Sequence, residues 1–119
     1  ESGVEMGRKI LQNGYNFTAV FASTDSNAIG LMQAAREIGI HIPEDISLIG
    51  FDNIRISALP QIDLTTVAQP KEEMAVSAVD MLMKKIETGS KTFTHKIIKP
   101  HLIERSSCKK LNEPICNSD

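Results

Sequence analysis

Apolar positions recur along this chain with two different spacings. Short runs rich in β-branched and aromatic residues have the composition of strands, and longer segments with apolar residues three or four positions apart have the pattern of amphipathic helices. The predicted strands are residues 18–23, 46–50, 64–67, 92–98 and 101–104. The predicted helices are residues 2–13, 26–38 and 70–88. Because strands and helices alternate, the sequence predicts an α/β fold with a parallel sheet flanked by helices.

Helix-capping residues stand at the ends of the predicted helices. Ser2 and Glu5 have the spacing of a capping box, in which the two side chains bind free backbone N–H groups of the first turn. Asp25 precedes the second helix, and we assign it mainly to capping, with contact to a ligand as the alternative. Pro70 suits the first position of the third helix, and Gly89 suits its end.

The second predicted helix carries an apolar stripe that indicates its buried face. The stripe consists of Ala28, Leu31, Met32, Ala35 and Ile38. Ile29 lies off this stripe by roughly 120° on a helix that turns 100° per residue. Such a residue is either a single exposed apolar side chain or a contact with a partner chain.

The third predicted helix has a similar stripe. Its members are Ala75, Ala78, Val79, Leu82 and Ile86. This face needs a packing partner, which is the chain's own sheet, a second chain, or segments outside this sequence. We therefore expect the isolated chain to pair with itself or to rearrange.

Composition and charge argue against several functional classes. With 119 residues, 41% hydrophobic and 24% charged, the chain has the composition of one small globular domain. The formal net charge of −2 argues against direct nucleic-acid binding, which needs clustered Lys and Arg. No apolar run approaches the ~20 residues of a membrane span.

Reactive side chains are also sparse. Cys108 and Cys116 are too few for a disulfide framework or a structural zinc site, and the three histidines lack metal-ligand spacing. The sequence has no HExxH, GxSxG or phosphate-loop motif. We therefore expect neither an enzyme nor a bound metal or cofactor.

One stretch, residues 42–53 (IPEDISLIGFDN), joins a predicted strand to a carboxylate. The strand ends at Gly50, and Asp52 follows two positions later. In open α/β sheets, ligands bind outside the carboxyl ends of strands. Asp52 is therefore a candidate acceptor for the hydroxyl groups of a sugar or the N–H groups of a base. The alternative is a carboxylate that forms a turn with Asn53, and Phe51 is expected to pack rather than to stack on a ligand.

Several motifs occur in an order and spacing that resemble one protein family. They are residues 21–30 (FASTDSNAIG), 34–40 (AAREIGI), 42–53 (IPEDISLIGFDN), 64–67 (LTTV), 69–70 (QP) and 102–107 (LIERSS). Together they resemble the C-terminal part of the effector-binding region of LacI/GalR-family bacterial transcription regulators. The sequence departs from the family at residues 61–63 (QID), because the family often has Pro directly before Leu-Thr-Thr. The loop after Asp52 is therefore expected to take a different path.

The resemblance implies a two-lobed fold like that of periplasmic sugar-binding proteins, of which this chain would form a partial lobe. Residues 1–107 would be the C-terminal part of the effector-binding and dimerisation region. Within them, residues 70–98 would belong to the N-terminal lobe. Residues 108–119 would form a polar C-terminal tail, and we expect the chain to be frayed from Ser106 onward.

The same resemblance implies roles for individual residues. Asp52 aligns with an effector-contacting Asp. Thr24 aligns with a polar ligand-contact position of some relatives, with local capping as the alternative. Gln69 lies where the chain would cross between lobes, and it either lines the cleft or is a polar hinge residue. Ile29 lies on the face through which the family dimerises, which favours an interface contact over simple exposure.

These observations predict the effector-sensing and dimerisation segment of a cytoplasmic DNA-binding transcription repressor. Its expected partners are a second copy in a homodimer and a sugar or purine-like effector. Operator DNA would be contacted only through an N-terminal headpiece outside this sequence, and no membrane is expected. The alternative is a fragment of a periplasmic sugar-binding protein of an uptake system, which would share the fold.

Overall fold

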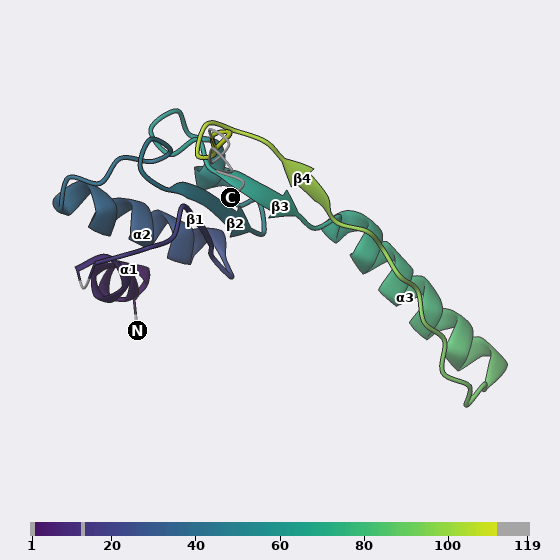
Figure 1. The fold of residues 1–119 in the computed structure, drawn as a ribbon. Coiled ribbons are helices and arrows are strands. Elements are labelled where there is room, and N and C mark those ends of the chain that lie inside the picture. The colour runs from purple at the N-terminus through teal and green to yellow at the C-terminus, as the bar shows by residue number, and fades with distance from the viewer. Residues whose placement is uncertain (1, 13, 112–119) are drawn as a thin grey trace, which may run out of the picture.

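A four-stranded sheet organises the chain in the computed structural model, which describes residues 2–12 and 14–111 (Figure 1). In chain order the elements are α1 (Gly3–Gln12), β1 (Ala19–Phe21), α2 (Asp25–Glu37), β2 (Ser47–Phe51), the 3-10 helix η1 (Arg55–Ala58), β3 (Thr65–Ala68), α3 (Lys71–Thr88) and β4 (His101–Ile103). The strand order is β1-β2-β3-β4; the first three strands are parallel and β4 is antiparallel to β3. The predicted α/β class with a mainly parallel sheet is confirmed.

The parallel strands align their carboxyl ends at one side of the sheet. The register pairs Phe21 with Ile49 and Phe51 with Val67. Parallel neighbours need a crossover connection, and α2 supplies it between β1 and β2. The loops that follow β1, β2 and β3 therefore leave the sheet on the same side, which we call the carboxyl edge.

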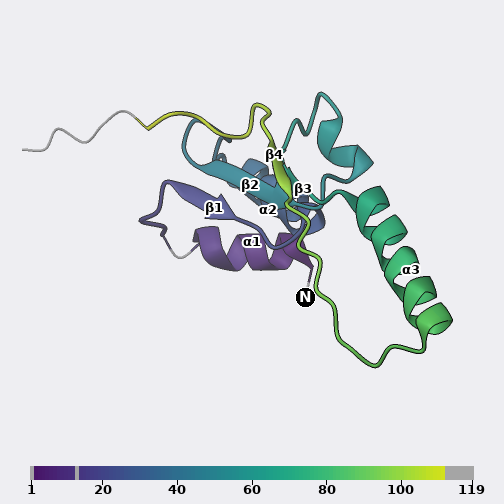
Figure 2. The same cartoon turned by 90° about the vertical axis from the view of Figure 1, so that its right-hand side faces the viewer.

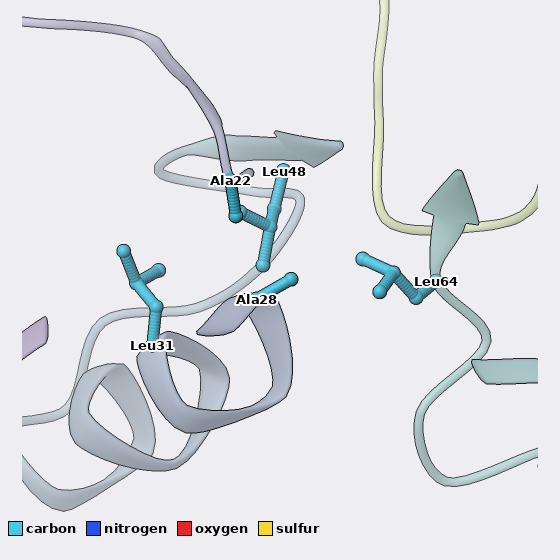
Figure 3. Packing of buried hydrophobic residues seen from close by; sticks show 5 residues of the cluster. All are labelled: Ala22, Ala28, Leu31, Leu48 and Leu64. Atoms are coloured by element: carbon cyan, nitrogen blue, oxygen red, sulfur yellow. The ribbon is translucent and has the colours of Figure 1, made fainter. Parts of the chain in front are cut away.

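Helices α1 and α2 lie on one face of the sheet (Figure 2). The core between α2 and the strands is a small apolar cluster, shown in Figure 3: Ala22, Ala28, Leu31, Leu48 and Leu64. Leu48 and Leu64 are fully buried, and burial of such a side chain stabilises a fold by about 1.5–3 kcal/mol. A second cluster of Leu11, Ala35 and Ile46 continues the core toward α1.

Helix α2 is packed on two sides, because α1 lies against it as well as the sheet. A Cβ added to Gly30 would lie 2.5 Å from the carbonyl carbon of Gly3, so the close approach of the two helices requires glycine. Contact with α1 also explains why Ala34, outside the predicted stripe, is buried. Within the predicted stripe, Ala28, Leu31 and Ala35 are buried, as expected. Ile38 is 40% exposed because the helix has already ended at Glu37.

The helix caps follow the sequence in most places. The reciprocal hydrogen bonds of the Ser2–Glu5 capping box are both present, at 3.1 and 3.3 Å. Gly89 ends α3 with a left-handed φ of 60°. Thr24, and not Asp25, caps α2, because the Thr24 hydroxyl accepts a hydrogen bond from the backbone N–H of Asn27 at 3.2 Å. The assignment of Asp25 to capping is therefore wrong. The predicted end of the first helix at residue 13 lies outside the described residues.

Helix α3 and residues 90–98 form an arm that extends away from the sheet (Figures 1 and 2). Most of the arm is open to solvent, and Val79 and Ile86 of the predicted stripe are 58% and 65% exposed. The predicted strand at residues 92–98 is wrong, because this segment runs beside α3 without pairing to any strand of the described chain. β-Propensity alone cannot form a strand without a neighbour to complete its hydrogen bonds.

After β4 the chain returns to the sheet. Ser107 is 2% exposed; its hydroxyl donates to the carbonyl oxygen of Leu48 at 2.6 Å and accepts from the N–H of Thr65 at 2.8 Å. This residue therefore links β2 to the start of β3. The expectation of fraying from Ser106 onward is wrong here, because Ser107 is held by buried hydrogen bonds. Residues 112–119 of the predicted tail lie outside the described residues.

Candidate functional site

The predicted effector-binding residues all lie in loops at the carboxyl edge. Thr24 lies between β1 and α2, Asp52 directly follows β2, and Gln69 directly follows β3. Asp52 and Gln69 are half-buried, as is Thr24. This arrangement agrees with the general position of ligand sites in open α/β sheets.

Asp52 and Gln69 are in direct contact. The side-chain amide of Gln69 donates a hydrogen bond to Oδ1 of Asp52 at 2.8 Å. The backbone around Asp52 is also fixed, because its N–H donates to the carbonyl of Val67 at 2.9 Å and its carbonyl accepts from the ammonium group of Lys71 at 3.0 Å. Within the described residues, no hydrogen bond is made to Oδ2 of Asp52, which leaves one carboxylate oxygen as an acceptor for a ligand.

The loop that carries Asp52 has an unusual backbone. Asp52 and Asn53 have positive φ values of 107° and 47°. Each such non-glycine residue costs on the order of 1–3 kcal/mol, and persists only where the surroundings fix it. One restraint is Arg105, whose guanidinium donates to Oδ1 of Asn53 at 2.8 Å and to the carbonyl of Leu64 at 2.6 Å. The loop is therefore held in a conformation that an unrestrained chain would avoid.

A second restraint is the buried carboxyl group of Asp25. This residue is 0% exposed. Its Oδ2 accepts from the hydroxyl of Ser57 at 2.5 Å and from the backbone N–H of Ile54 at 2.9 Å. Its Oδ1 accepts from the hydroxyl of Thr66 at 2.5 Å. Asp25 thus joins the start of α2 to the loop after Asp52 and to β3. Full burial also removes the alternative of direct ligand contact in this structure.

The remaining predicted site residue, Thr24, acts as a helix cap in this structure. Within the described residues, no hydrogen bond joins it to Asp52 or Gln69. Its hydroxyl, occupied by the N–H of Asn27, still has a donor hydrogen for a second partner. Contact of Thr24 with an effector stays a prediction.

Aromatic side chains add an apolar element that the sequence reasoning missed. Phe21, the last residue of β1, is 62% exposed at the carboxyl edge. Its ring lies edge-on to the half-buried ring of Phe51, with 6.5 Å between centroids. Phe51 thus packs, as expected, whereas Phe21 presents an open ring. The signal in the sequence is an aromatic residue at the last position of a strand that precedes a polar loop.

Ile29, the predicted interface residue, is half-buried and packs against the main core cluster. Apolar side chains are also exposed on η1 and its C-cap, where Ile56 is 52% and Leu59 48% exposed. Partial burial of Ile29 means that it contributes to its own core as well as to the surface. The role of Ile29 in dimerisation stays a prediction.

The described residues contain no group of three or more His, Cys, Asp and Glu side chains that could hold a metal ion. His41 instead pairs with Asp45 in a local turn, 3.5 Å apart. The backbone N–H of His41 hydrogen-bonds to Asp45 and holds the pKa of that carboxyl below its usual value. Among the described helices, none has the length and apolar character needed to cross a lipid bilayer.

Comparison with known proteins gives consistent matches over nearly the whole chain. Residues 3–108 match the model of the periplasmic binding protein-like domain family. The chain is 43% identical over 108 residues to the HTH-type transcriptional repressor PurR of Pectobacterium atrosepticum, covering 90% of this chain and 31% of that protein. It is 39% identical over 100 residues to the HTH-type transcriptional regulator MalR of Clostridium butyricum, covering 84% and 30%. The chain thus spans about 30% of the length of these relatives.

Solved structures agree with the sequence comparison. A LacI family transcriptional regulator from Enterococcus faecium, determined with bound ribose, superposes with a TM-score of 0.78 at 32% identity. The match covers 92% of this chain and 40% of that one. The relatives are therefore longer proteins, of which this chain resembles one continuous part.

Proposed function

Because this chain belongs to the periplasmic binding protein-like family and matches the effector-binding region of LacI-family transcription regulators, we propose that it senses a small effector in a DNA-binding repressor. The effector would bind at the carboxyl edge, against Asp52, and between this lobe and a second lobe. We assign residues 70–98 to that second lobe, and the exposed apolar face of α3 to contacts within it. DNA binding would come from a headpiece outside the present sequence.

The observation that carries this proposal is the pair formed by Asp52 and Gln69. Gln69 occupies Oδ1 of the carboxylate and leaves Oδ2 as an acceptor. A hydrogen bond to a charged group contributes roughly 1.5–3 kcal/mol, enough to give a polar ligand a fixed orientation. The hydroxyl groups of a sugar or the N–H groups of a purine-like base are suitable donors. The Thr24 hydroxyl would add a second polar contact.

The exposed ring of Phe21 is chemically suited to both ligand classes. It can pack against the C–H face of a sugar or stack on the plane of a base. The structure of the Enterococcus faecium relative was determined with bound ribose, which is a sugar. For this chain the proposal covers a sugar or a purine-like metabolite.

The effector would regulate DNA binding by changing how the two lobes of each subunit are arranged in a dimer. An effector that binds one arrangement of the lobes more tightly shifts the equilibrium toward it. In a homodimer that includes Ile29 in its interface, a lobe rotation would change the spacing of the two headpieces and their fit to operator half-sites. A protein with this role acts in the cytoplasm, where its DNA lies.

The test uses the full-length protein that carries this sequence. Calorimetric titration with ribose and with hypoxanthine, as a sugar and a purine base, should give saturable binding of one of them. The same compound should change the affinity of the protein for DNA from its own promoter region. Saturable binding by a protein that does not bind DNA, and whose upstream sequence is a signal peptide, would instead indicate a solute-binding protein of an uptake system.

A further inference from the structure

The carboxyl group of Asp25 is fully buried and hydrogen-bonds to the loop after Asp52 and to β3, so it is not itself part of the proposed effector site. We propose that Asp25 is a positioning residue, which holds the loop of Asp52 in the conformation that binds the effector. This inference rests on the proposed function, because it concerns how the same site is kept in shape. Its basis is the set of groups that Asp25 contacts and the space that the sheet leaves for it.

The hydrogen bonds of Asp25 end on the residues just after Asp52. Oδ2 accepts from the backbone N–H of Ile54 and from the hydroxyl of Ser57. These residues lie two and five positions after Asp52 in the chain. Oδ1 accepts from the hydroxyl of Thr66. One fully buried carboxyl group therefore holds the loop at two points and β3 at a third.

Thr66 carries the restraint one residue closer to Asp52. Its hydroxyl has one hydrogen, which it donates to Asp25, and its oxygen accepts from the backbone N–H of Asn53 at 3.3 Å. The N–H groups of Asn53 and Ile54 are thus bound, indirectly and directly, to the same carboxyl group. These are the two peptide groups that follow Asp52.

The sheet is shaped to admit this carboxyl group. A Cβ added to Gly50 would lie 2.3 Å from Oδ1 of Asp25, closer than any real contact allows. Gly50 lies in β2, two positions before Asp52, and the structure gives it no positive φ that would itself require glycine. The glycine is therefore explained by the need to bring Asp25 against the strand that ends at Asp52.

The position of this loop matters because its backbone is held away from ordinary conformations. Asp52 and Asn53 both have positive φ values, and release of the two N–H groups would let them relax. Relaxation would move the Asp52 carboxylate away from Gln69 and away from a bound effector. Asp25 would then affect effector affinity without touching the effector.

The test compares Asp25→Asn with Ser107→Ala in the full-length protein. Asn keeps the size of the side chain but replaces one acceptor oxygen with a donor. Ser107→Ala is the matched control, since Ser107 is also buried and its hydroxyl bridges two strands, with hydrogen bonds to Leu48 and Thr65 and not to residues 52–57. Thr66→Val keeps the shape of the side chain and removes its hydrogen bonds to Asp25 and to Asn53, while the bonds of Asp25 to Ile54 and Ser57 remain. It is the milder variant if Asp25→Asn does not fold.

Two readouts keep this inference separate from the proposed function. Hydrogen–deuterium exchange of the peptide covering residues 50–58 needs no effector. Calorimetry with ribose or hypoxanthine, whichever the unmodified protein binds, measures the affinity, and Asp52→Ala is measured in parallel. For Asp25→Asn, the expected result is exchange in that peptide at least about tenfold faster than in Ser107→Ala, and binding at least about tenfold weaker. Ser107→Ala should keep the effector affinity of the unmodified protein.

Equal exchange and equal affinity in Asp25→Asn and Ser107→Ala would overturn the positioning role, because Asp25 would then contribute stability alone. Loss of affinity in Asp52→Ala together with normal affinity in Asp25→Asn would overturn it as well, and would leave the proposed site intact. If Asp52→Ala binds normally, the proposed site is wrong. The exchange measurement still shows in that case whether Asp25 holds the loop.

Discussion

Gln69 donates a hydrogen bond to the carboxylate of Asp52 at 2.8 Å, across a sequence separation of 17 residues. The contact links the loop after β2 to the loop after β3 at the carboxyl edge. It orients Asp52 by occupying one of its two oxygens. Two residues that the sequence suggests separately are thereby parts of one polar unit.

Replacing Gln69 with Ala should weaken effector binding by about 5- to 10-fold, because loss of one oriented hydrogen bond costs on the order of 1 kcal/mol. The fold should be little affected, since Gln69 is half-buried. Calorimetric titration of the full-length protein measures the change. Gln33→Ala is the matched control, because Gln33 also donates its amide to a carboxylate, that of Glu37, but on the exposed surface of α2. Equal affinities in the two variants would show that the Gln69 contact does not prepare Asp52 for a ligand.

Ser107→Ala should lower the free energy of unfolding by roughly 1–3 kcal/mol, the cost of leaving buried polar groups without partners. The variant removes the bridge between the carbonyl of Leu48 and the N–H of Thr65. Urea denaturation measures the difference. The neighbouring variant Ser106→Ala is the control, because Ser106 is exposed and its hydroxyl makes only a long 3.4 Å bond. Identical denaturation midpoints for the two variants would show that the bridge has no net effect on stability.

Ile29→Glu should shift the full-length protein from dimer to monomer, because it would bury a charge at an apolar contact. Since Ile29 also packs against the core, a modest fall in thermal stability should accompany the change. Sedimentation velocity reports the oligomeric state, and far-UV circular dichroism confirms folding. Ile38→Glu makes the same chemical change at a 40% exposed position on the C-cap of α2. A dimer that persists in Ile29→Glu would place the interface elsewhere.

The ion pair between Arg8 of α1 and Glu37 of α2 should make helix packing sensitive to acid. A hydrogen bond from Arg8, and to a smaller extent one from Gln33, holds the pKa of Glu37 below its usual value. A lowered pKa in the folded state means that the stabilisation is present above the unfolded value and is lost as the pH falls through the folded value. Arg8→Ala should therefore reduce the melting temperature near neutral pH but have a smaller effect in acid. A difference from the unmodified protein that stays constant with pH would contradict this account.

Local sequence patterns predict most of the elements and several of their ends. The alternation of strands and helices and the Ser2–Glu5 capping box are all properties of nearby residues, and the structure contains them. The segment 92–98 shows the limit of such patterns. Its composition favours a strand, but strand formation depends on a neighbouring strand that the described chain does not supply.

The site shows the same limit at the level of single residues. Asp25 stands at a helix start, where local rules favour capping, and Thr24 takes that role instead. The carboxyl group of Asp25 binds Ser57 and Thr66, which are 32 and 41 positions away. Contacts at such separations depend on the packed sheet, so neither the spacing nor the residue types reveal them. The glycine at position 50 agrees with this contact, but its reason, a Cβ that would lie 2.3 Å from Oδ1 of Asp25, is visible only in the structure.

The most direct test of the account is the effector affinity of Asp52→Ala in the full-length protein, measured by calorimetry with ribose or hypoxanthine. Glu44→Ala is the control, because it removes an exposed carboxylate from the loop before β2, at the opposite end of that strand. The account predicts an affinity about 10- to 100-fold weaker for Asp52→Ala, as expected for the loss of a hydrogen bond to a charged group, and an unchanged affinity for Glu44→Ala. Effector binding by Asp52→Ala that matches the unmodified protein would contradict the central claim that this carboxylate binds the effector.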